Sequence, residues 1–418
     1  MARIQARVAA SASPLTAAQR PGWLQVAVWR EWLTAPAFKE SLGVWGLTRV
    51  MFVLLTYFGV ILFNSKLHVN VLQSFAHSML PAWGDTRWDT FWYLNIARRG
   101  YQWKTAAVTS PTAFFPLYPL LIRIGVLLSH RSYIVVALVL SNLSFLAALV
   151  YLWRLAAWEL GQRVAARTVL YIAIFPTALF FFAGYTESLF LLLTVACFYH
   201  LRRHDWLWAG VFGALASATR VTGILLVVPF AYEYARACNF SPRRMVSPGL
   251  VGLLLVPAGL VAFMAYLRYS VGDALAFSHS QAAWQKIFTV RLWAGLVGSV
   301  HQLWVLPSAS FYEAHNAINL AAALLFLACT VLAARKLPAA YTLYLVAFWL
   351  VTLSSPALAG GYPVPLISMS RYVLVLFPVF LYFGILGEMR WFHDAYLVLA
   401  PSLLALFTIQ FILDRWII

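Results

Sequence analysis

Long apolar runs, separated by short polar and basic loops, dominate the pattern along the chain. Residues 42–63 form one such run, long enough to cross the hydrocarbon core of a bilayer, which takes about 20 apolar residues. Alternating segments of about 10 residues, the mark of membrane-spanning strands, are not visible. The pattern therefore predicts an all-α polytopic membrane protein with about 10–12 transmembrane helices.

Two apolar stretches predict helical hairpins. Residues 168–201 are too many for one span and are punctuated by Pro176 and Gly184, so we expect a hairpin with its tip at 182–188. Residues 206–234 are flanked by basic loops on both sides, which predicts a second hairpin with Arg220 at its outer tip. The other expected spans are 133–153, 250–267, 318–334, 341–356, 371–387 and 396–412, and 113–129 is expected to be half-inserted or tilted.

The charge distribution predicts the topology. The chain has 30 lysines and arginines against 13 acidic residues, a formal net charge of +17. Because the basic residues stand in short loops beside apolar runs, they are typical of the positive-inside bias and of anionic headgroups, and argue against nucleic-acid binding. We expect residues 1–40 to be a basic, partly disordered cytoplasmic tail and 41–418 a single transmembrane domain, with outer loops at 64–112 and 268–316.

Two aspartates stand four residues apart in the aromatic stretch "WGDTRWDTFWYLNIARRGYQW". On a helix, Asp85 and Asp89 would share one face. The surrounding aromatic and apolar positions predict an amphipathic helix in the membrane interface, ending at Gly100. Aspartates that simply face water are the structural alternative. As oxygen ligands the pair would suit Mg²⁺ or Mn²⁺, so a divalent cation stays open, and no other cofactor is indicated.

Three further ionisable residues stand at expected outer helix ends, where charge in a membrane protein marks function. Glu187 follows Thr186 at an expected helix start, which the helix dipole favours. Arg220 and Arg371 stand among small hydroxyl residues, and arginine binds phosphate in bidentate fashion. Together they predict a pocket for an anionic, phosphate-bearing lipid beside a carboxylate base. A plain helix cap and arginines that snorkel to the interface are the alternatives.

The loop "GDALAFSHSQAAW" is rich in hydrogen-bonding groups, and we expect His279 and Gln281 to contact a substrate. Trp88 and Tyr372, which adjoin Asp89 and Arg371 in the sequence, are expected to contribute aromatic contacts to the same substrate. An ordinary amphipathic interfacial loop is the alternative. The three cysteines form no CxxC or Cys/His cluster, so neither a disulfide nor a zinc site is indicated.

An ordered succession of motifs resembles the PIG-V-like mannosyltransferases of the GT-C superfamily, which are polytopic glycosyltransferases. The motifs are "RWDTFWYLNIARRGY", "AFFPLYPLLIR", "FFFAGYTESLFLL", "ASATRVTGILL", "GDALAFSHSQAAW" and "SRYVLVLFP". The resemblance extends over about residues 42–387. One departure is "TRVTG", where the family often has "TRSNG", and it concerns the acceptor.

The resemblance implies a GT-C-like bundle that takes a sugar from a polyprenyl- or dolichyl-phosphate carrier on the non-cytoplasmic face. It also implies that Asp89 is the base, that the donor is similar to β-linked lipid-phosphate-mannose, and that inversion gives an α-linked product. Physical chemistry agrees, because a single displacement needs one carboxylate to accept a proton. An anionic lipid phosphate is stabilised by arginine as it leaves, rather than by a general acid. Asp85 would assist Asp89 or bind a metal.

Two other functions stay open, a lipid or sugar transporter or flippase without chemistry, and a structural subunit. Transporters often place charges at mid-membrane within repeats, whereas this chain concentrates them at helix ends and shows no inverted repeat. The acceptor, a lipid-linked or envelope glycan, is not specified. A bias toward Arg, Ala, Leu and Trp favours a bacterium, hence the plasma membrane rather than the endoplasmic reticulum.

Overall fold

The computed structural model describes residues 35–63, 80–84, 88–101, 110–357 and 364–415. The chain divides into two units, Met1–Glu40 and Ser41–Ile418. The predicted cytoplasmic tail therefore lies almost wholly outside the described residues, as do Asp85 and much of the predicted first outer loop. Apart from the start of the first described helix, every element named below belongs to the second unit.

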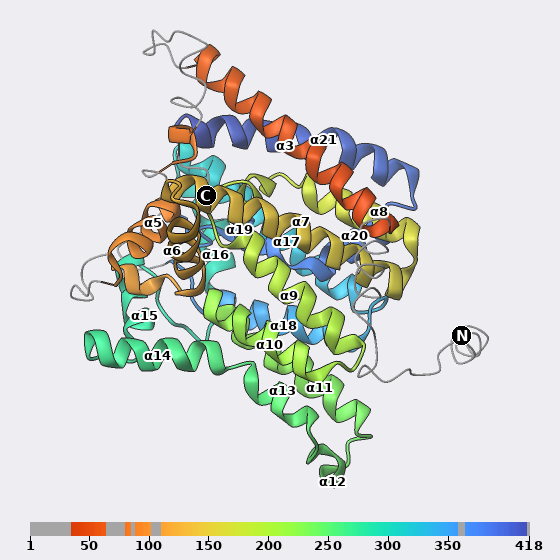
Figure 1. Cartoon of the computed structure of the whole chain (residues 1–418). Helices are drawn as coiled ribbons and strands as arrows, with labels where there is room; N and C mark the ends of the chain where they lie inside the picture. Colours follow the sequence, from red (N-terminus) through yellow and green to blue (C-terminus); the bar gives the residue numbers. More distant parts are fainter. Residues whose placement is uncertain (1–34, 64–79, 85–87, 102–109, 358–363, 416–418) are drawn as a thin grey trace. The chain divides into compact units, whose positions relative to one another are not determined.

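Helices form the regular structure of the described residues, which confirms the all-α class (Figure 1). Within those residues, one isolated antiparallel bridge, between Lys286 and Ala357, is the only strand-like pairing. Four helices are long and apolar enough to cross a membrane: α3 (Pro36–Phe63), α7 (Tyr133–Leu160), α17 (Phe311–Ala333) and α21 (Arg390–Ile412). An α-helix rises about 1.5 Å per residue, so each exceeds the thickness of about 30 Å that it has to cross.

Two bent helix pairs raise the number of candidate spans in the described chain to six. The first pair, α13 (Gly249–Leu255) and α14 (Ala258–Val271), is bent by 42°. The second joins α19 (Met369–Tyr372) and η6 (Val373–Val375) to α20 (Phe377–Leu386), with a bend of 79°. The proline at the second position of α20 lacks the N–H that a continuous helix would need there.

A count by helix length does not test the expected 10–12 spans, because several predicted spans are broken or short in the described residues. The 168–201 run falls into α8 (Gln162–Ala173), η2 (Ala178–Phe181) and α9 (Glu187–Arg202). The 206–234 run falls into α10 (Trp206–Thr219), η3 (Val221–Leu226) and α11 (Val227–Ala237). Shorter helices are α5 (Trp88–Arg99), η1 (Pro111–Ala113), α6 (Leu117–Ser129), α12 (Pro242–Met245), α15 (Ala276–His279), η4 (Ser280–Trp284), α16 (Ala294–Val305) and α18 (Ala339–Leu353).

Both breaks predicted from the sequence are present. α8 ends before Pro176, as expected for a residue that disfavours helix in the position before it, and the segment 182–186 leads irregularly into α9. Arg220 separates α10 from η3 with extended backbone angles, φ −151° and ψ 147°. These breaks place a helix start at Glu187 and a helix end at Arg220, and both residues belong to the candidate site described below.

The helices around α9 and α10 approach one another closely. α9 packs against α7 and α10, and α10 packs against α13 and α14 (Figure 1). A Cβ atom built on Gly210 of α10 would stand 2.3 Å from the carbonyl oxygen of Gly252, and one on Gly252 would stand 2.2 Å from that of Trp206. Small residues of this kind allow membrane helices to bring their backbones into contact.

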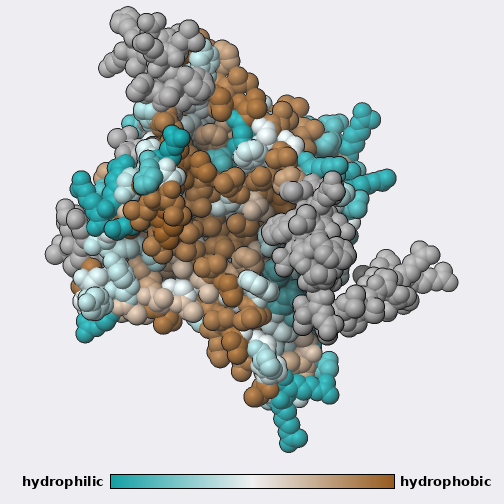
Figure 2. Space-filling view, viewed as in Figure 1, coloured by the Kyte–Doolittle hydropathy of each residue, from teal (hydrophilic) through white to brown (hydrophobic). Residues whose placement is uncertain are grey.

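Apolar side chains form a broad region on the molecular surface. Figure 2 shows hydrophobic residues across the middle of the visible face, with hydrophilic side chains gathered toward its margins. Trp208, Leu254 and Val261 are each more than half exposed. Because soluble monomers seldom expose large contiguous apolar patches, this surface fits one that contacts lipid and supports an integral membrane protein.

The glycine contact between α10 and α13 predicts a specific weakness. Gly210→Ala would force the Cβ into the backbone of α13, and overpacking of this kind costs about 1–3 kcal/mol. We expect a lower midpoint of thermal unfolding in detergent. Gly46→Ala is the matched control, since a Cβ there meets no atom within 4 Å. Equal midpoints for the two variants would contradict the close packing.

Candidate active site

A cavity of about 1110 Å³ opens among the ends of α5, α10, η4, α18 and α19. Ligand pockets usually measure about 300–1,000 Å³, so this one has room for a large substrate. Its wall is mostly apolar and aromatic. The charged or ionisable side chains on the wall, other than tyrosine, are Asp89, Arg220, His279, Lys286 and Arg371.

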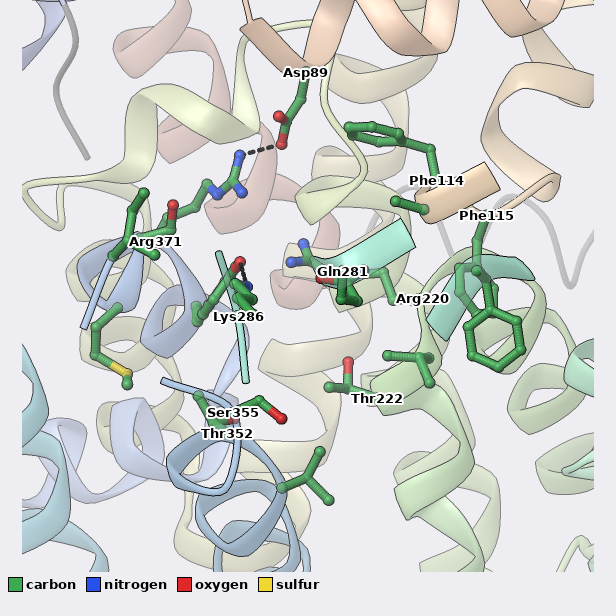
Figure 3. Close-up of a pocket in the computed structure, with 18 of the residues that line it drawn as sticks. Asp89, Phe114, Phe115, Arg220, Thr222, Gln281, Lys286, Thr352, Ser355 and Arg371 are labelled. Carbon is green, nitrogen blue, oxygen red and sulfur yellow. Dashed lines mark hydrogen bonds and ion pairs between the residues drawn. The ribbon is translucent and has the colours of Figure 1, made fainter. Parts of the chain in front are cut away.

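Four of the predicted residues form one chain of alternating charge. The guanidinium Nη1 of Arg371 donates to Oδ2 of Asp89 (Figure 3). The Nε of Arg371 lies 3.5 Å from Oε1 of Glu187. Nη1 of Arg220 donates to the same Glu187 oxygen at 2.7 Å. Residues more than 280 positions apart in the sequence thus meet in one network, and two carboxylates balance the charge of two arginines.

Helix ends position these charges. Asp89 and Glu187 stand in the first turns of α5 and α9, where the unpaired N–H groups and the helix dipole stabilise a negative charge. Arg220 caps the C-terminal end of α10, where the dipole favours a positive charge. The breaks in the predicted hairpins are therefore the reason why oppositely charged groups meet here.

The segment before Glu187 is held by side chains from neighbouring helices. Asn142 Nδ2 of α7 donates to the carbonyl oxygen of Phe182 at 3.0 Å, and Ser141 Oγ donates to that of Tyr185 at 3.1 Å. The hydroxyl groups of Tyr93 and Thr186 lie 3.2 Å apart. Thr186 makes no side-chain hydrogen bond as an N-cap, so its hydroxyl joins α9 to α5 instead of capping the helix.

Glu187 itself lies behind the two arginines. Its side chain is 1% exposed, and it is absent from the cavity wall. Its second oxygen, Oε2, is buried with no hydrogen-bond partner among the described residues. The geometry therefore does not favour the predicted direct contact between Glu187 and a substrate. Burial behind Arg220 and Arg371 instead suits a carboxylate that fixes those two side chains.

Lys286 and Tyr372 form a second polar pair on the wall. Lys286 Nζ donates to the Tyr372 hydroxyl at 2.8 Å and lies 4.9 Å from the centre of the same ring. Sequence alone assigned no role to Lys286. Its signal was its place among the ionisable residues at expected outer helix ends, and nothing local in the sequence shows that Tyr372 would lie beside it.

His279 and Asp273 form a third pair, near the cavity mouth. The two side chains meet through Nδ1 and Oδ2 at 2.7 Å, and the Leu275 N–H donates to the other carboxylate oxygen at 2.9 Å. The hydrogen bond from His279, followed by that from Leu275, lowers the pKa of Asp273 below its usual value. Because Asp273 occupies Nδ1, the Nε2 atom of His279 is left for other contacts.

The remaining predicted residues have these places. Trp88 and Gln281 line the cavity, and their contacts with a substrate stay a prediction. The ring of Trp88 also packs on Phe411, with centroids 5.2 Å apart, so it contributes to the helix packing as well. Asp85 lies outside the described residues. Among the residues that are described, no group of three or more His, Cys, Asp or Glu side chains is arranged to hold a metal, and the divalent cation stays a prediction.

The chain of ion pairs predicts that removing the charge of Glu187, at its centre, lowers the stability of the protein. Glu187→Gln keeps the shape of the side chain but leaves Arg220 and Arg371 without their shared counter-charge. Breaking a buried ion pair costs about 3–5 kcal/mol, so we expect a clearly lower midpoint of thermal unfolding in detergent. Glu388→Gln, the same change at an exposed position, should leave the midpoint unchanged. A shift no larger than that of the control would contradict the network.

Comparison with known proteins identifies the chain's relatives. It is 35% identical over 213 residues to the GPI alpha-1,6-mannosyltransferase 2 of Mus musculus, covering 46% of this chain and 42% of the mouse protein. It is 26% identical over 189 residues to the GPI mannosyltransferase 2 of Yarrowia lipolytica, covering 44% of this chain and 50% of that protein. The match thus spans about half or less of the length of these curated relatives.

Solved structures show only distant likeness. ArnT from Cupriavidus metallidurans, bound to undecaprenyl phosphate, superposes with a TM-score of 0.45 at 13% identity, covering 82% of this chain and 75% of that one. The archaeal oligosaccharyltransferase AglB from Archaeoglobus fulgidus gives a TM-score of 0.43 at 12% identity, covering 90% of this chain and 55% of that one.

The decisive comparison is with a protein family, Mannosyltransferase (PIG-V), whose sequence model matches residues 49–270. That match covers just over half of the chain, and it contains Asp89, Glu187 and Arg220 but ends before Lys286 and Arg371. It confirms the resemblance predicted from the motifs, and the chain belongs to the PIG-V mannosyltransferase family.

Proposed function

We propose that the protein transfers mannose from a polyprenyl- or dolichyl-phosphate-linked donor to a hydroxyl group of a lipid-linked or envelope glycan, on the non-cytoplasmic face of a membrane. One observation carries the proposal. A cavity in a lipid-facing helical protein brings Asp89 together with three cations, Arg220, Lys286 and Arg371. Membership of the PIG-V family supports mannose as the sugar.

Asp89 is the base in this proposal. Arg371 contacts Oδ2, and no hydrogen bond within the described chain occupies Oδ1, which leaves that oxygen for a substrate hydroxyl. The side chain is 21% exposed, so a substrate in the cavity has access to it. General-base catalysis requires a carboxylate oxygen within reach of the substrate hydroxyl, and Oδ1 of Asp89, free of hydrogen bonds within the described chain, can take that place. Arg371 would also fix the direction in which Asp89 faces the cavity.

The proposed reaction is a single displacement. The acceptor oxygen forms a bond to the anomeric carbon while the bond from that carbon to the phosphate oxygen breaks, and Asp89 takes the hydroxyl proton. The electron pair of the broken bond leaves with the lipid phosphate, so a β-linked donor gives an α-linked product. Arg371 and Arg220 are proposed to stabilise the phosphate, because arginines keep their charge in a partly desolvated site.

The other wall residues are proposed to orient sugar and acceptor. His279 and Gln281 supply hydrogen-bonding groups on the cavity wall, and Trp88 and Tyr372 supply aromatic faces. Glu187 acts indirectly, by holding Arg220 and Arg371 in place. Asp85 remains a proposed helper of Asp89 or a ligand of Mg²⁺ or Mn²⁺. A metal bound there would supply further charge stabilisation to the phosphate.

The names of the relatives refer to GPI, so a membrane-anchored glycolipid is the acceptor class that we propose. Both substrates would then be lipids, which suits a cavity that has apolar and aromatic walls beside its charged groups. We propose the plasma membrane as the location in a bacterium, which the composition favours, and the endoplasmic reticulum in a eukaryote.

Replacement of the base tests the proposal. Asp89→Asn keeps the shape of the side chain but cannot accept the hydroxyl proton, and general-base catalysis typically contributes about 10²–10⁴-fold. We expect the transfer of label from radiolabelled polyprenyl-phosphate-mannose to lipid acceptors, measured in membranes, to fall by about that factor.

Asp394→Asn is the matched control, since Asp394 is exposed and pairs only weakly with Arg390, 3.6 Å away and four positions earlier in α21. It should transfer label at the wild-type rate. Full transfer by Asp89→Asn would reject Asp89 as the base. No transfer by the wild-type protein to any lipid acceptor would reject the enzyme and favour a transporter or flippase.

A further inference from the structure

Charge on the cavity wall is unevenly compensated. Arg220 has Glu187 as its counter-ion, and Arg371 has both Asp89 and Glu187. Lys286 has no carboxylate within 4 Å in the part of the chain that is described, and its polar contact is the hydroxyl of Tyr372. The excess positive charge of the described wall therefore resides at Lys286.

Three cations surround the ring of Tyr372. Lys286 Nζ lies 4.9 Å from the ring centre, the Arg371 guanidinium carbon 5.5 Å and the Arg220 guanidinium carbon 5.7 Å. Each gains a cation–π attraction, but cations this close also repel one another in a partly desolvated site. An anion beside the ring removes that repulsion, and the two carboxylates of the network already belong to the arginines.

The backbone holds Lys286 in place. It forms an antiparallel bridge with Ala357, the Ile287 N–H donates to the carbonyl oxygen of Pro356 at 3.1 Å, and Thr289 N–H donates to that of Ser354 at 2.8 Å. The side chain therefore enters the cavity from a fixed position beside the end of α18, and Figure 3 shows Lys286 between Arg371 and Ser355. Lys286 is therefore unlike a lysine whose side chain simply extends toward the membrane surface.

The pair presents hydrogen-bond donors as well as charge. An ammonium group has three N–H donors, and Tyr372 takes one of them. The phenol hydroxyl, once it has accepted this bond, still has its own proton to donate. Two remaining ammonium donors and one phenol donor on the same wall match the oxygens of a phosphate group.

The wall beyond Lys286 is suited to an isoprenoid chain. Ile287 and Phe288, the next two residues, line the cavity together with Phe348 and Val351 of α18. Phe288 is 78% exposed, so this part of the wall reaches the molecular surface. Figure 3 shows Arg371 and Asp89 on the opposite side of Lys286 from Thr352 of α18. A phosphate at Lys286 thus has its lipid on one side and its sugar beside the base.

We propose that Lys286, positioned by Tyr372, is the residue that selects the phosphodiester of the lipid-linked donor, with the lipid chain directed along Ile287, Phe288 and Val351. The inference rests on the proposed function and deepens it. In this proposal Lys286, rather than the two arginines, recognises the phosphate. The arginines are neutralised by carboxylates, whereas Lys286 has no carboxylate partner among the described residues. A phosphodiester carries a single negative charge, which matches the single uncompensated cation.

Direct binding tests this assignment without any transfer reaction. The probes are geranylgeranyl methyl phosphate, a phosphodiester with one negative charge, and the uncharged geranylgeraniol, titrated into the full-length protein in detergent. Lys286→Met should bind the phosphate about 10- to 100-fold more weakly, as for the loss of a hydrogen bond to a charged group, and the alcohol as before. Lys286→Arg should retain most of the phosphate affinity. Tyr372→Phe should weaken binding of the phosphate by a smaller factor.

Lys336→Met is the matched control, an exposed lysine between α17 and α18 that is absent from the cavity wall, and it should bind both probes as the wild type does. Wild-type affinity of Lys286→Met for the phosphate, or wild-type protein that does not prefer the phosphate over the alcohol, would overturn the assignment. If mannose transfer proceeds normally in Lys286→Met, the inference fails and the proposed function stands. If binding depends on Lys286 but the wild type transfers no mannose, the proposed function fails and the phosphate site stands.

Discussion

The structure of the site depends on one constraint: two arginines and two carboxylates, which are buried or partly buried in a membrane protein, must compensate one another. Uncompensated charges in such a setting are expensive, and Glu187 is almost fully buried. Because Glu187 contacts Arg220 and Arg371, and Arg371 also contacts Asp89, the ends of α5, α9, α10 and α19 have to meet at one place. The cavity lies where these ends converge.

The interrupted helices serve this same constraint. A continuous helix would satisfy its own backbone groups and would leave no helix end in the interior. The breaks before α9 and after α10 supply a helix start for a carboxylate and a helix end for an arginine, so that the dipoles support the charges. The polar side chains of α7 that bind the carbonyl groups of Phe182 and Tyr185 stabilise the irregular segment. Lys286 differs, because a backbone bridge holds it and no described carboxylate compensates it.

Sequence was sufficient for the helical class, the family and the two breaks, because each depends on local signals: apolar run lengths, Pro176, and a charge within an apolar stretch. It also identified Asp89, Arg220 and Arg371, since charges at outer helix ends are rare enough to stand out. It did not show which charges pair, because the partners are up to 282 positions apart. For the same reason it did not show that Glu187 would lie behind the two arginines, or that Lys286 would stand beside Tyr372 on the cavity wall. Apolar length also did not reveal where a helix bends or becomes 3₁₀, as in the 206–234 stretch.

The central claim is that this cavity performs a single displacement at the anomeric carbon of a lipid-phosphate-linked mannose. The most direct test is the anomeric configuration of the product, determined by NMR after the purified protein in lipid vesicles has acted on β-linked polyprenyl-phosphate-mannose and a glycolipid acceptor. One carboxylate among the described wall residues and an anionic leaving group predict an α-linked mannose. A β-linked product would mean two successive displacements and would contradict the claim.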